Sequence, residues 1–531
     1  MKVLTAAQMR EVDRLSAERY SISGLQLMEN AAAGVVDYLE KNSANLDHLA
    51  IVVVCGKGNN GGDGFAIARL LRARGGRPVA ILCAGPEEVR GDAGVNLDRY
   101  RRAGGEIAFA RAPGDWPDAK KILLRADIVL DALFGTGLRG SVEGWLGGVI
   151  DDINSRRDVA RIVAVDIPSG LSADVGEVAG PAVDAHVTIT FTAPKIGQLL
   201  HPASQKVGRL VVVPIGSPRA LVEECSDSKV RWLEPGEISE IDLNRRADVN
   251  KGDFGHALVV AGSVGKTGAA VMAGWAALRS GAGLVTVATP EPCLPIVSGQ
   301  VPEMMTEPLA ATDFGSISAS SLENNRFAGL LRGKAIAAIG PGLSTGADTQ
   351  QFIRAVVREN PIPTVLDADG LNALAGHRAE LAAHKCESLV ITPHPGEMAR
   401  LIASSVADVQ RCRIDVAKAA ATEFKATVVL KGHETVIASP EGDVWVNSTG
   451  NPGMAKGGTG DVLTGMLAGI LAQHGRQNRT SAVCLAVYLH GLAGDLAARE
   501  IGEIPLMATD LIRAIPRAYS HILAELAHAR A

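Results

Sequence analysis

The chain has 531 residues, of which 47% are hydrophobic and 21% charged, with a formal net charge of −5 at pH 7. This length predicts more than one domain, and the composition excludes a disordered or fibrous chain. The 53 basic and 58 acidic side chains lack the basic excess that a nucleic-acid partner requires. Glycine supplies 59 positions and aromatic residues only 4%, so we expect backbone groups, more than aromatic stacking, to contact the ligands.

The cysteines and the first residues bear on the cellular compartment. The seven cysteines are an odd number and form no CxxC pair, which excludes a disulfide framework or a zinc site and favours a reducing compartment. The first fifteen residues, MKVLTAAQMREVDRL, carry charges where a secretory signal needs an apolar stretch. No uncharged apolar run approaches the ~20 residues of a membrane span. We therefore expect a soluble cytoplasmic protein with no membrane partner.

The first half of the chain alternates short apolar runs with amphipathic segments. The expected strands are IVVVC (51–55), PVAILCAG (78–85), IVLDAL (128–133), RIVAVDIP (161–168), HVTITF (186–191) and GRLVVVPIG (208–216). Helical segments such as FAIARLLRARG (65–75) and WLGGVIDDINSR (145–156) separate them. This pattern predicts a Rossmann-like three-layer α/β/α domain over residues 1–216. Residues 217–228 are polar and lack a sustained period, which predicts a linker.

The alternation restarts in the second half and predicts a further α/β domain over residues 229–531. Its expected strands are HALVVAG (256–262), LVTVAT (284–289), AIAAIG (335–340), TVLDAD (364–369), SLVITPH (388–394) and TVVLKG (427–432). The runs ETVIAS (434–439) and DVWVN (443–447) flank PEG and predict a hairpin. We expect one helical span from about Val409 to Phe424. Two apolar helices are expected to close the chain, one after Gly460 and one from about Ser481 to Arg499.

A glycine loop, CGKGNNGGDG (55–64), stands between the first expected strand and helix. The glycines that fit GxGxxG are Gly56, Gly58 and Gly61. Such a turn lets backbone N–H groups approach a pyrophosphate at a helix N-terminus. Two alternatives stay open: a purely structural turn, or a dehydrogenase site with Glu87 or Glu88 as ribose ligand. Asn59, Asn60 and Asp63 add polar side chains that a plain dinucleotide turn does not require.

Two more loops follow expected strands, at the edge where open α/β sheets bind ligands. They are DALFGTGLRGS (131–141) and VDIPSGLSADVG (165–176). In each loop an Asp follows the strand and a glycine-containing turn follows the Asp. A single Asp of this kind is more often a cap or turn residue than a catalyst. Two of them together with NNGGDG favour a site.

These three motifs together resemble the epimerase domain of the NAD(P)HX repair family, which interconverts the two C6 epimers of hydrated NADH and NADPH. The resemblance covers about residues 1–216. It implies Asp166 as the acid/base group near C6 and a potassium ion on Asn60, Asp131 and Ser169. The residues that it implies as substrate contacts are Asn59, Asn60, Gly61, Gly62, Asp63, Gly135, Thr136, Gly137, Leu138, Arg139, Gly140, Ser141 and Asp166.

The second domain carries GNPGMAKGGTGD (450–461) directly before an apolar helix. Its glycines can direct backbone N–H groups to one point at the helix N-terminus, which makes an anion hole. Asp461 can take a proton from a substrate hydroxyl while the amides hold a transferring phosphoryl group. The alternative is that Asp461 is only a helix cap.

This loop resembles the phosphoryl-transfer signature of ribokinase-like enzymes. With KGDFGHALVVAGS (251–263), GPGLS (340–344), TPHPGEMARL (392–401) and KGHET (431–435), the region resembles ADP-dependent NAD(P)HX dehydratase over about residues 229–525. The resemblance implies hydrate contacts at Ala269, Gly342, His394 and Asp461. It implies nucleotide contacts at Lys431, Gly432, His433, Glu434, Thr435 and Gly460.

The implied chemistry is phosphorylation of the C6 hydroxyl by ADP, with Asp461 as base and Mg²⁺ on the phosphates, followed by loss of phosphate. A dehydratase that accepts one epimer leaves the other unused, so fusion to an epimerase is chemically reasonable. We expect NAD(P)H hydrates and ADP as small-molecule partners, and a homo-oligomer.

Three rival hypotheses address the same residues. GSVGKT (262–267) is not a Walker loop, because position 260 is Val260 where the motif needs glycine. GLSTG (342–346) fits the nucleophile-elbow pattern, with Asp367 or Asp369 and His394 following in hydrolase order, but no HGGG-like segment precedes it. The closest rival is a vitamin or sugar kinase whose first domain is a nucleotide-binding regulatory module.

Overall fold

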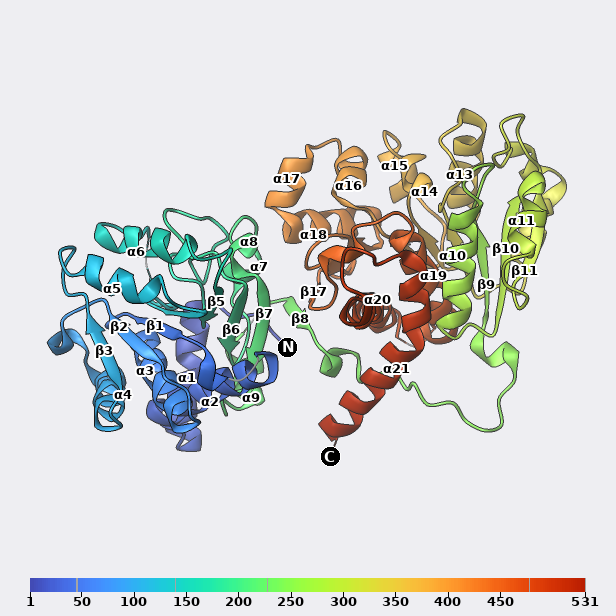
Figure 1. The fold of residues 1–531 in the computed structure, drawn as a ribbon. Helices are drawn as coiled ribbons and strands as arrows, with labels where there is room; N and C mark the ends of the chain where they lie inside the picture. The colour runs from blue at the N-terminus through green and yellow to red at the C-terminus, as the bar shows by residue number, and fades with distance from the viewer. Residues whose placement is uncertain (44–45, 139, 227, 477, 531) are drawn as a thin grey trace. The chain divides into compact units, whose positions relative to one another are not determined.

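The computed structural model describes residues 1–43, 46–138, 140–226, 228–476 and 478–530. The chain divides into two compact units, Lys2–Ser228 and Lys229–Ala531, with Met1 counted in the second (Figure 1). Both units are α/β, as the sequence predicts, and each is described by itself below.

The first unit contains seven strands and the helices that connect them. Its strands are β1 Ile51–Cys55, β2 Val79–Leu82, β3 Glu106–Phe109, β4 Ile128–Ala132, β5 Arg161–Val165, β6 Val187–Phe191 and β7 Arg209–Val213. Its α-helices are α1 Ala6–Tyr20, α2 Gly24–Asn42, α3 Asn59–Ala73, α4 Gly91–Arg102, α5 Trp116–Leu123, α6 Trp145–Asn154, α7 Ile196–Leu199, α8 Ser204–Val207 and α9 Arg219–Cys225. Short 3₁₀ turns are η1 Leu46–His48 and η2 Pro86–Glu88.

The first unit has three layers around a parallel sheet of order β3-β2-β1-β4-β5-β6-β7. Alternate residues of β1 enter different cores: Val53 packs with α2, α3 and α4, whereas Val52 packs with α5 and α6. The order reverses between β1 and β4. This is the switch point where an open α/β sheet binds ligands at the carboxyl ends of its strands.

The second unit begins at β8 Val230–Leu233 and ends in three long helices. Its other strands are β9 His256–Val260, β10 Leu284–Pro290, β11 Met305–Leu309, β12 Ile336–Ile339, β13 Thr364–Leu366, β14 Leu389–Ile391, β15 Thr427–Leu430, β16 Val436–Ala438 and β17 Val444–Asn447. Its α-helices are α10 Thr267–Arg279, α11 Leu294–Ser298, α12 Arg326–Leu331, α13 Ala347–Glu359, α14 Asp369–Asn372, α15 Arg378–Ala382, α16 Pro395–Ile402, α17 Val406–Arg411, α18 Arg413–Phe424, α19 Thr459–His474, α20 Arg479–Ile501 and α21 Ala508–Arg530. Its 3₁₀ turns are η3 Pro235–Ile238, η4 Lys251–Phe254, η5 Glu291–Cys293, η6 Ala319–Asn325 and η7 Pro452–Met454.

The second sheet has the order β11-β10-β9-β12-β13-β14-β15-β16-β17-β8. Its strands are parallel from β11 to β15, and β15, β16 and β17 then pair antiparallel, which confirms the predicted hairpin. Helices α10, α19, α20 and α21 pack over one face and enclose the largest apolar core (Figure 1). The order reverses between β9 and β12, so this sheet also has a switch point.

Several boundaries differ from the expectation. The expected linker 217–228 contains helix α9, which joins the first unit because Leu221 and Val222 are buried. The expected span Val409–Phe424 is two helices, α17 and α18, that meet at Cys412. A third closing helix, α21, runs through Pro516, a residue that normally ends a helical pattern.

Helix α20 passes a simple test for a membrane span, against the expectation that no apolar run is long enough. It is the one helix of the described residues that is long and apolar enough, and 78% of its most apolar window is buried in the structure. Residues from Ala482 to Ala497 contribute to the core under α19 and α21. Its apolar character therefore serves the interior of the second unit.

Candidate active sites

The first glycine loop lies directly against the 131–141 loop. A Cβ on Gly56 would stand 2.0 Å from the carbonyl oxygen of Leu133, and one on Gly61 would stand 1.9 Å from the oxygen of Gly56. Glycine is therefore required for this close approach of backbones, and the turn then opens helix α3 at Asn59. Two of the three motifs thus meet at the switch point of the first sheet.

Three residues predicted to hold a metal meet around the backbone of Phe134. Asn60 Nδ2 donates to the carbonyl oxygen of Phe134 at 2.8 Å, and the Ser169 hydroxyl accepts from its N–H at 2.8 Å. Ser169 also donates to Asp131, from its hydroxyl at 2.6 Å and from its backbone N–H at 2.8 Å. Burial raises the pKa of Asp131 to about 6, and the hydrogen bonds from Ser169 oppose the shift.

The same cluster has one unsatisfied oxygen. Asn60 Oδ1 is buried, and no partner for it exists within the described part of the chain. A buried amide oxygen without a donor costs free energy unless a cation or a water approaches it. Carboxylate, hydroxyl, amide and carbonyl oxygens are the donors that hard cations prefer. The residues present therefore fit a hard cation.

Asp166 ends β5 in a left-handed conformation, with φ of 64°. Its Oδ1 lies 2.5 Å from the ammonium of Lys195 and accepts from the Thr190 hydroxyl at 3.1 Å. Lys195 is only 1% exposed, and it also donates to Thr190 at 2.7 Å. Gln198 donates to the Asp166 carbonyl at 2.7 Å. The carboxylate is therefore held in one orientation by a buried cation.

Lys195 is a functional candidate that sequence reasoning missed. It follows strand β6 in TAPKIG, a segment with no glycine motif and no second charge to mark it. A fully buried lysine is rare unless it is paired. The burial of Lys195 depends on the N-terminal segment, because Leu4 hydrogen-bonds to both of its neighbours. The Leu4 N–H donates to the Pro194 carbonyl at 2.9 Å, and the Leu4 carbonyl accepts from the Ile196 N–H at 3.2 Å.

Two more carboxylates share the surroundings of this ion pair. Burial, and then repulsion from Asp166 and Asp13, raises the pKa of Asp63 well above its usual range. Burial also raises the pKa of Asp13, on α1, to about 6, against the attraction of Lys195. Three carboxyl groups near one ammonium cannot all be ionised at low cost. The raised pKa of Asp63 thus favours its protonated form.

The remaining predicted contacts of the first unit are only partly placed. Arg139 lies outside the described residues. Thr136, Gly137, Leu138, Gly140 and Ser141 follow Gly135, whose Cβ position is 3.0 Å from the Cβ of Asn60. Glu88, the ribose ligand of the dehydrogenase alternative, is engaged by Lys57 at 2.7 Å and by the N–H of Gly85 at 3.0 Å.

In the second unit, the GGTGD turn reaches a buried charged cluster. A Cβ on Gly460 would lie 3.5 Å from Lys431 Nζ and 3.7 Å from Asp367 Oδ2. Lys431 Nζ lies 2.7 Å from Asp367 Oδ1 and 3.6 Å from Glu397 Oε2. Thr464, on α19, donates to Asp367 Oδ2 at 2.7 Å. The helix that starts with the loop is thus fixed to the end of strand β13.

Asp461 stands beside this cluster in the first turn of α19. Burial raises its pKa to about 7, repulsion from Asp367 and Asp369 adds to the shift, and Lys431 opposes it. A carboxyl group that titrates near neutral pH is well matched to general-base catalysis. The sequence identified Asp461 and Lys431. It considered Asp367 only in the hydrolase hypothesis, assigned no role to Glu397 within the TPHPGEMARL motif, and missed Thr464.

Three predicted hydrate contacts lie on other segments of the unit: Ala269 in α10, Gly342 in a loop and His394 at the start of α16. Gly342 has φ of 63°, and a Cβ there would stand 3.0 Å from the Cβ of Ala269, so these two predicted positions are neighbours. His394 caps α16, and its Nδ1 accepts from the N–H of Gly396 at 3.0 Å. Burial lowers the pKa of His394. The imidazole is thus neutral near pH 7.

The predicted nucleotide segment, residues 431–435, begins at Lys431 and turns sharply. Gly432 has φ of 144°, and a Cβ there would lie 2.7 Å from an Arg413 guanidinium nitrogen. Burial raises the pKa of Glu434 to about 8, against the attraction of Arg413. Thr435 donates to the Gly432 carbonyl at 3.1 Å, and the His433 side chain is 68% exposed. Arg413, which sequence reasoning missed, packs against this turn.

The hydrolase geometry is not assembled. Ser344 has the positive φ of a nucleophile elbow, 77°, but its N–H donates to Asp369 at 2.8 Å. Nδ1 of His394 is engaged by Gly396. Among the described residues no hydrogen bond joins Ser344 to His394. A nucleophile–base pair is therefore missing.

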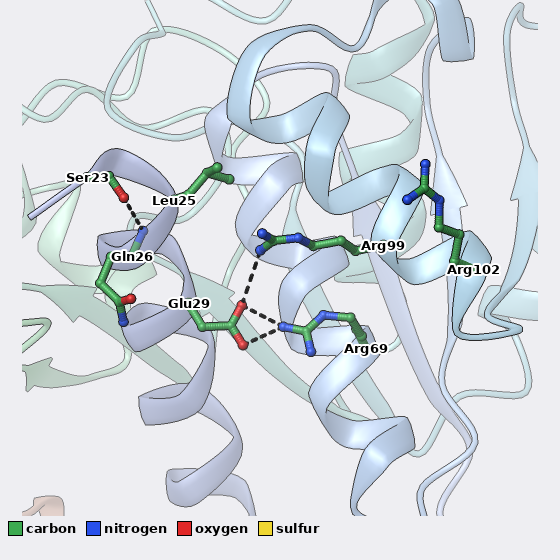
Figure 2. A pocket seen from close by; sticks show the side chains of 7 residues that line it. All are labelled: Ser23, Leu25, Gln26, Glu29, Arg69, Arg99 and Arg102. Carbon is green, nitrogen blue, oxygen red and sulfur yellow. Dashed lines mark hydrogen bonds and ion pairs between the residues drawn. The ribbon is translucent and has the colours of Figure 1, made fainter.

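A separate hollow of about 530 Å³ lies away from every motif residue, between α2, α3 and α4 (Figure 2). Arg69 and Arg99 converge there on Glu29, at 2.5 and 3.9 Å, whereas Arg102 points elsewhere. Glu29 offsets one of these three positive charges, so the lining of the hollow keeps a basic excess.

Comparisons with known proteins agree with this two-site layout. A family model described as YjeF-related protein N-terminus matches residues 24–197, and one described as NAD(P)H-hydrate dehydratase matches residues 257–517. A protein of Moorella thermoacetica, described as bifunctional NAD(P)H-hydrate repair enzyme Nnr, is 42% identical over 97% of this chain and 96% of its own. The chain belongs to the bifunctional NAD(P)H-hydrate repair enzyme family.

Other members of the bifunctional NAD(P)H-hydrate repair enzyme family match over similar lengths. The Escherichia coli K12 protein is 34% identical, over 96% of this chain and 92% of its own. Among solved structures, a Bacillus subtilis ADP/ATP-dependent NAD(P)H-hydrate dehydratase co-crystallized with ATP/Mg²⁺ is 33% identical. It covers 55% of this chain and 99% of its own, with a TM-score of 0.47.

Proposed function

We propose that unit Lys2–Ser228 epimerises hydrated NADH and NADPH at C6, and that unit Lys229–Ala531 dehydrates one epimer at the expense of ADP. Family membership over nearly the whole chain supports repair of nicotinamide cofactors as the overall activity. One geometric observation carries the assignment to two sites. Each unit brings its own motif loops and a buried carboxylate–lysine pair, Asp166–Lys195 or Asp367–Lys431, to one end of its sheet.

For epimerisation, the C6 hydroxyl leaves with a proton and water returns to the other face of the ring. Asp166 passes the proton at its carboxylate, and Lys195 fixes the orientation of that carboxylate. Asp63, whose raised pKa keeps a proton available, stands close enough to interact electrostatically with Asp166. This is general acid–base catalysis by a positioned carboxyl group.

We propose potassium for the oxygen cluster of Asn60, Asp131 and Ser169. When bound, the ion neutralises the buried Asp131 and gives Asn60 Oδ1 a partner. Replacing potassium by tetramethylammonium is expected to slow epimerisation, because the larger cation does not fit between these oxygens. Asn60→Ala is expected to weaken the apparent potassium affinity at least about tenfold. This is the lower limit of the loss in affinity that is typical when a residue around a metal site is changed. Potassium titrations of the initial rate test this, and identical curves for both proteins would contradict it.

For dehydration, Asp461 takes the proton of the C6 hydroxyl, and the oxygen attacks the terminal phosphoryl group of ADP, which releases AMP. The phosphate then leaves C6 as a proton leaves C5, and the dihydronicotinamide double bond returns. The amides of Gly458 and Gly460, at the start of α19, are proposed to stabilise the transferring group. Lys431 balances the local negative charge.

Magnesium is proposed to arrive with the nucleotide. Among the described residues no group of three or more His, Cys, Asp or Glu side chains could hold a metal ion. Mg²⁺ usually keeps several waters and binds through substrate phosphates and one or two carboxylates. Asp461 directly follows the glycine turn, and Asp367 Oδ2 lies 3.7 Å from the position of a Cβ on Gly460. When bound, the ion supplies charge neutralisation at the phosphates.

The dehydration rate is expected to depend on pH through Asp461. Its pKa is raised to about 7, so the reactive carboxylate is scarce below that pH and dominates above it. At saturating ADP, kcat should rise with a midpoint of about 7 and then level off. A profile of kcat from pH 5.5 to 9 measures this. A midpoint near the ordinary aspartate value of about 4 would contradict the assignment.

The rival function is a vitamin or sugar kinase with a regulatory first unit. A kinase leaves a stable phosphorylated product, whereas a dehydratase releases reduced nicotinamide and free phosphate in equal amounts. Incubation of the full chain with the hydrate, ADP and Mg²⁺, with phosphate and dihydronicotinamide absorbance followed together, separates the two. We expect equal release, and a phosphorylated hydrate that persists would favour the kinase.

We further propose a cytoplasmic location and a homo-oligomeric state. All seven cysteines are free thiols, which suits a reducing compartment. Sedimentation of the full chain measures the oligomeric state.

A further inference from the structure

Helix α20 contacts both ends of residues 449–460, the segment that leads into α19 and includes its first two residues, called here the transfer loop. At the start of the loop, Thr449 Oγ1 donates to the Tyr488 carbonyl at 2.8 Å. Asp495 accepts from the Gly450 N–H at 3.0 Å and from Asn451 Nδ2 at 2.9 Å. At the end of the loop, His490 Nε2 lies 2.9 Å from the Thr459 carbonyl oxygen. None of these α20 residues belongs to a recognised motif.

The surface of α20 is hollowed where the transfer loop lies on it. A Cβ on Gly491 would stand 2.3 Å from Thr449 Oγ1 and 2.6 Å from the Thr449 carbonyl carbon. A Cβ on Gly494 would stand 2.3 Å from Met454 Sδ. Glycine inside a helix lowers stability, so the presence of Gly491 and Gly494 in α20 requires a structural explanation. They let the loop approach the helix closely.

The hydrogen bond from His490 has a defined direction. A carbonyl oxygen can only accept, so Nε2 carries the hydrogen. Burial lowers the pKa of His490 to about 4, against the hydrogen bond to Thr459. The ring is therefore neutral and donates at any pH at which the enzyme works. The contact does not switch with pH.

Inside the transfer loop, the Thr459 hydroxyl bonds to the carbonyls of Met454 at 2.9 Å and Lys456 at 2.7 Å. Lys456 Nζ donates to the Ile504 carbonyl, outside the loop. The position of the loop thus depends on the α20 contacts at its two ends together with this contact in its middle. The His490 bond lies one residue before Gly460 and two before Asp461. Small displacements at this point would move the anion hole and the base together.

We propose that His490 and Asp495 are positioning residues of the dehydratase site, which hold the transfer loop so that its amides and Asp461 face the phosphoryl group. This inference rests on the proposed dehydratase activity. Of the nucleotide contacts, residues 431–435 lie outside the loop, and Gly460 alone lies within it. Loss of the α20 contacts therefore affects the chemical step more than nucleotide binding.

The test uses Asp495→Ala and His490→Leu in the full chain, with Asp495→Asn and His490→Gln as conservative partners. We expect kcat for dehydration to fall about tenfold to a hundredfold in the first pair, as for a small misplacement of reacting groups. KM for ADP should stay within about twofold. His490→Gln retains an N–H at the position of Nε2 and should recover most of kcat. Asp495→Asn retains an oxygen acceptor and should be intermediate.

Cys484→Ala provides the matched control. Cys484 is buried in the same helix as part of the apolar core of the unit. Its loss destabilises the second unit without releasing the loop. If Cys484→Ala lowers kcat as much as Asp495→Ala, or if His490→Leu and Asp495→Ala keep full kcat, the inference is overturned.

Amide hydrogen exchange gives a readout that does not need turnover. In Asp495→Ala, the amides of residues 449–460 should exchange at least about tenfold faster, because the acceptor of the Gly450 N–H is lost. In Cys484→Ala they should keep their rate relative to the rest of the unit. Unchanged exchange in Asp495→Ala would overturn the inference even if the proposed activity failed. If the wild-type chain does not dehydrate the hydrate but exchange is faster in Asp495→Ala, the proposed function is contradicted and the inference about α20 stands.

Discussion

Asp461→Ala is expected to lower the dehydration rate about 10²- to 10⁴-fold, the range typical for loss of a general base. The side chain is the one carboxylate at the glycine turn whose pKa, about 7, suits proton removal from a hydroxyl. Epimerisation by the same chain should be unchanged, because its residues belong to the other unit. Initial rates of both reactions on one preparation measure the two effects.

The stability of this variant provides an independent control. A raised pKa means that the folded state binds the Asp461 proton more tightly than the unfolded chain does. Ionised Asp461 therefore opposes folding, and its contribution worsens as pH rises from about 4 through 7. Asp461→Asn should have an equal or higher Tm at pH 8. Loss of both activities, or a clearly lower Tm with Asn, would contradict the assignment.

Asp166→Asn is expected to reduce epimerisation about 10²- to 10⁴-fold and to leave dehydration of the accepted epimer unchanged. The variant removes the group that moves the proton and leaves the buried Lys195 without its partner at 2.5 Å. Breaking one side of a buried ion pair typically costs about 3–5 kcal/mol. The free energy of unfolding of the first unit must therefore be measured with the rate.

A matched control separates catalysis from stability in this unit. Asp152 pairs with Lys120 at 2.6 Å and accepts from the Trp116 indole at 2.8 Å, away from the motif loops. Asp152→Asn should lower stability and keep the epimerisation rate per folded molecule. An Asp166→Asn enzyme that epimerises at the wild-type rate would exclude Asp166 as the acid/base group.

The sequence predicts the strands of the sheet interiors far better than the edges. Strands β1 and β9 are uninterrupted apolar runs because both faces are covered by helices. Edge strands β3 and β11 were missed because they are only half buried, and β11 contains Pro308, which an edge position tolerates. The helix α9 was missed because only its Leu221 and Val222 are buried.

The site residues also differ in how well the sequence predicts them. Glycine loops at strand ends are visible in sequence because backbone approach demands glycine, as at Gly56 and Gly460. The roles of Lys195, Asp367 and Glu397 become recognisable only when the fold buries them beside another charge, although the last two lie in segments that the sequence analysis quotes. Isolated charged residues carry no periodic or spacing signal. Their roles depend on tertiary contacts that a single sequence does not encode locally.

The most direct test of paired repair supplies the full chain with a mixture of both C6 epimers of NADH hydrate, with ADP, Mg²⁺ and potassium. Recovery of dihydronicotinamide absorbance is followed to completion. Both epimers should be converted by the wild-type chain, whereas Asp166→Asn should recover only the fraction that the dehydratase accepts directly. Wild-type recovery that stops at that fraction would contradict the account.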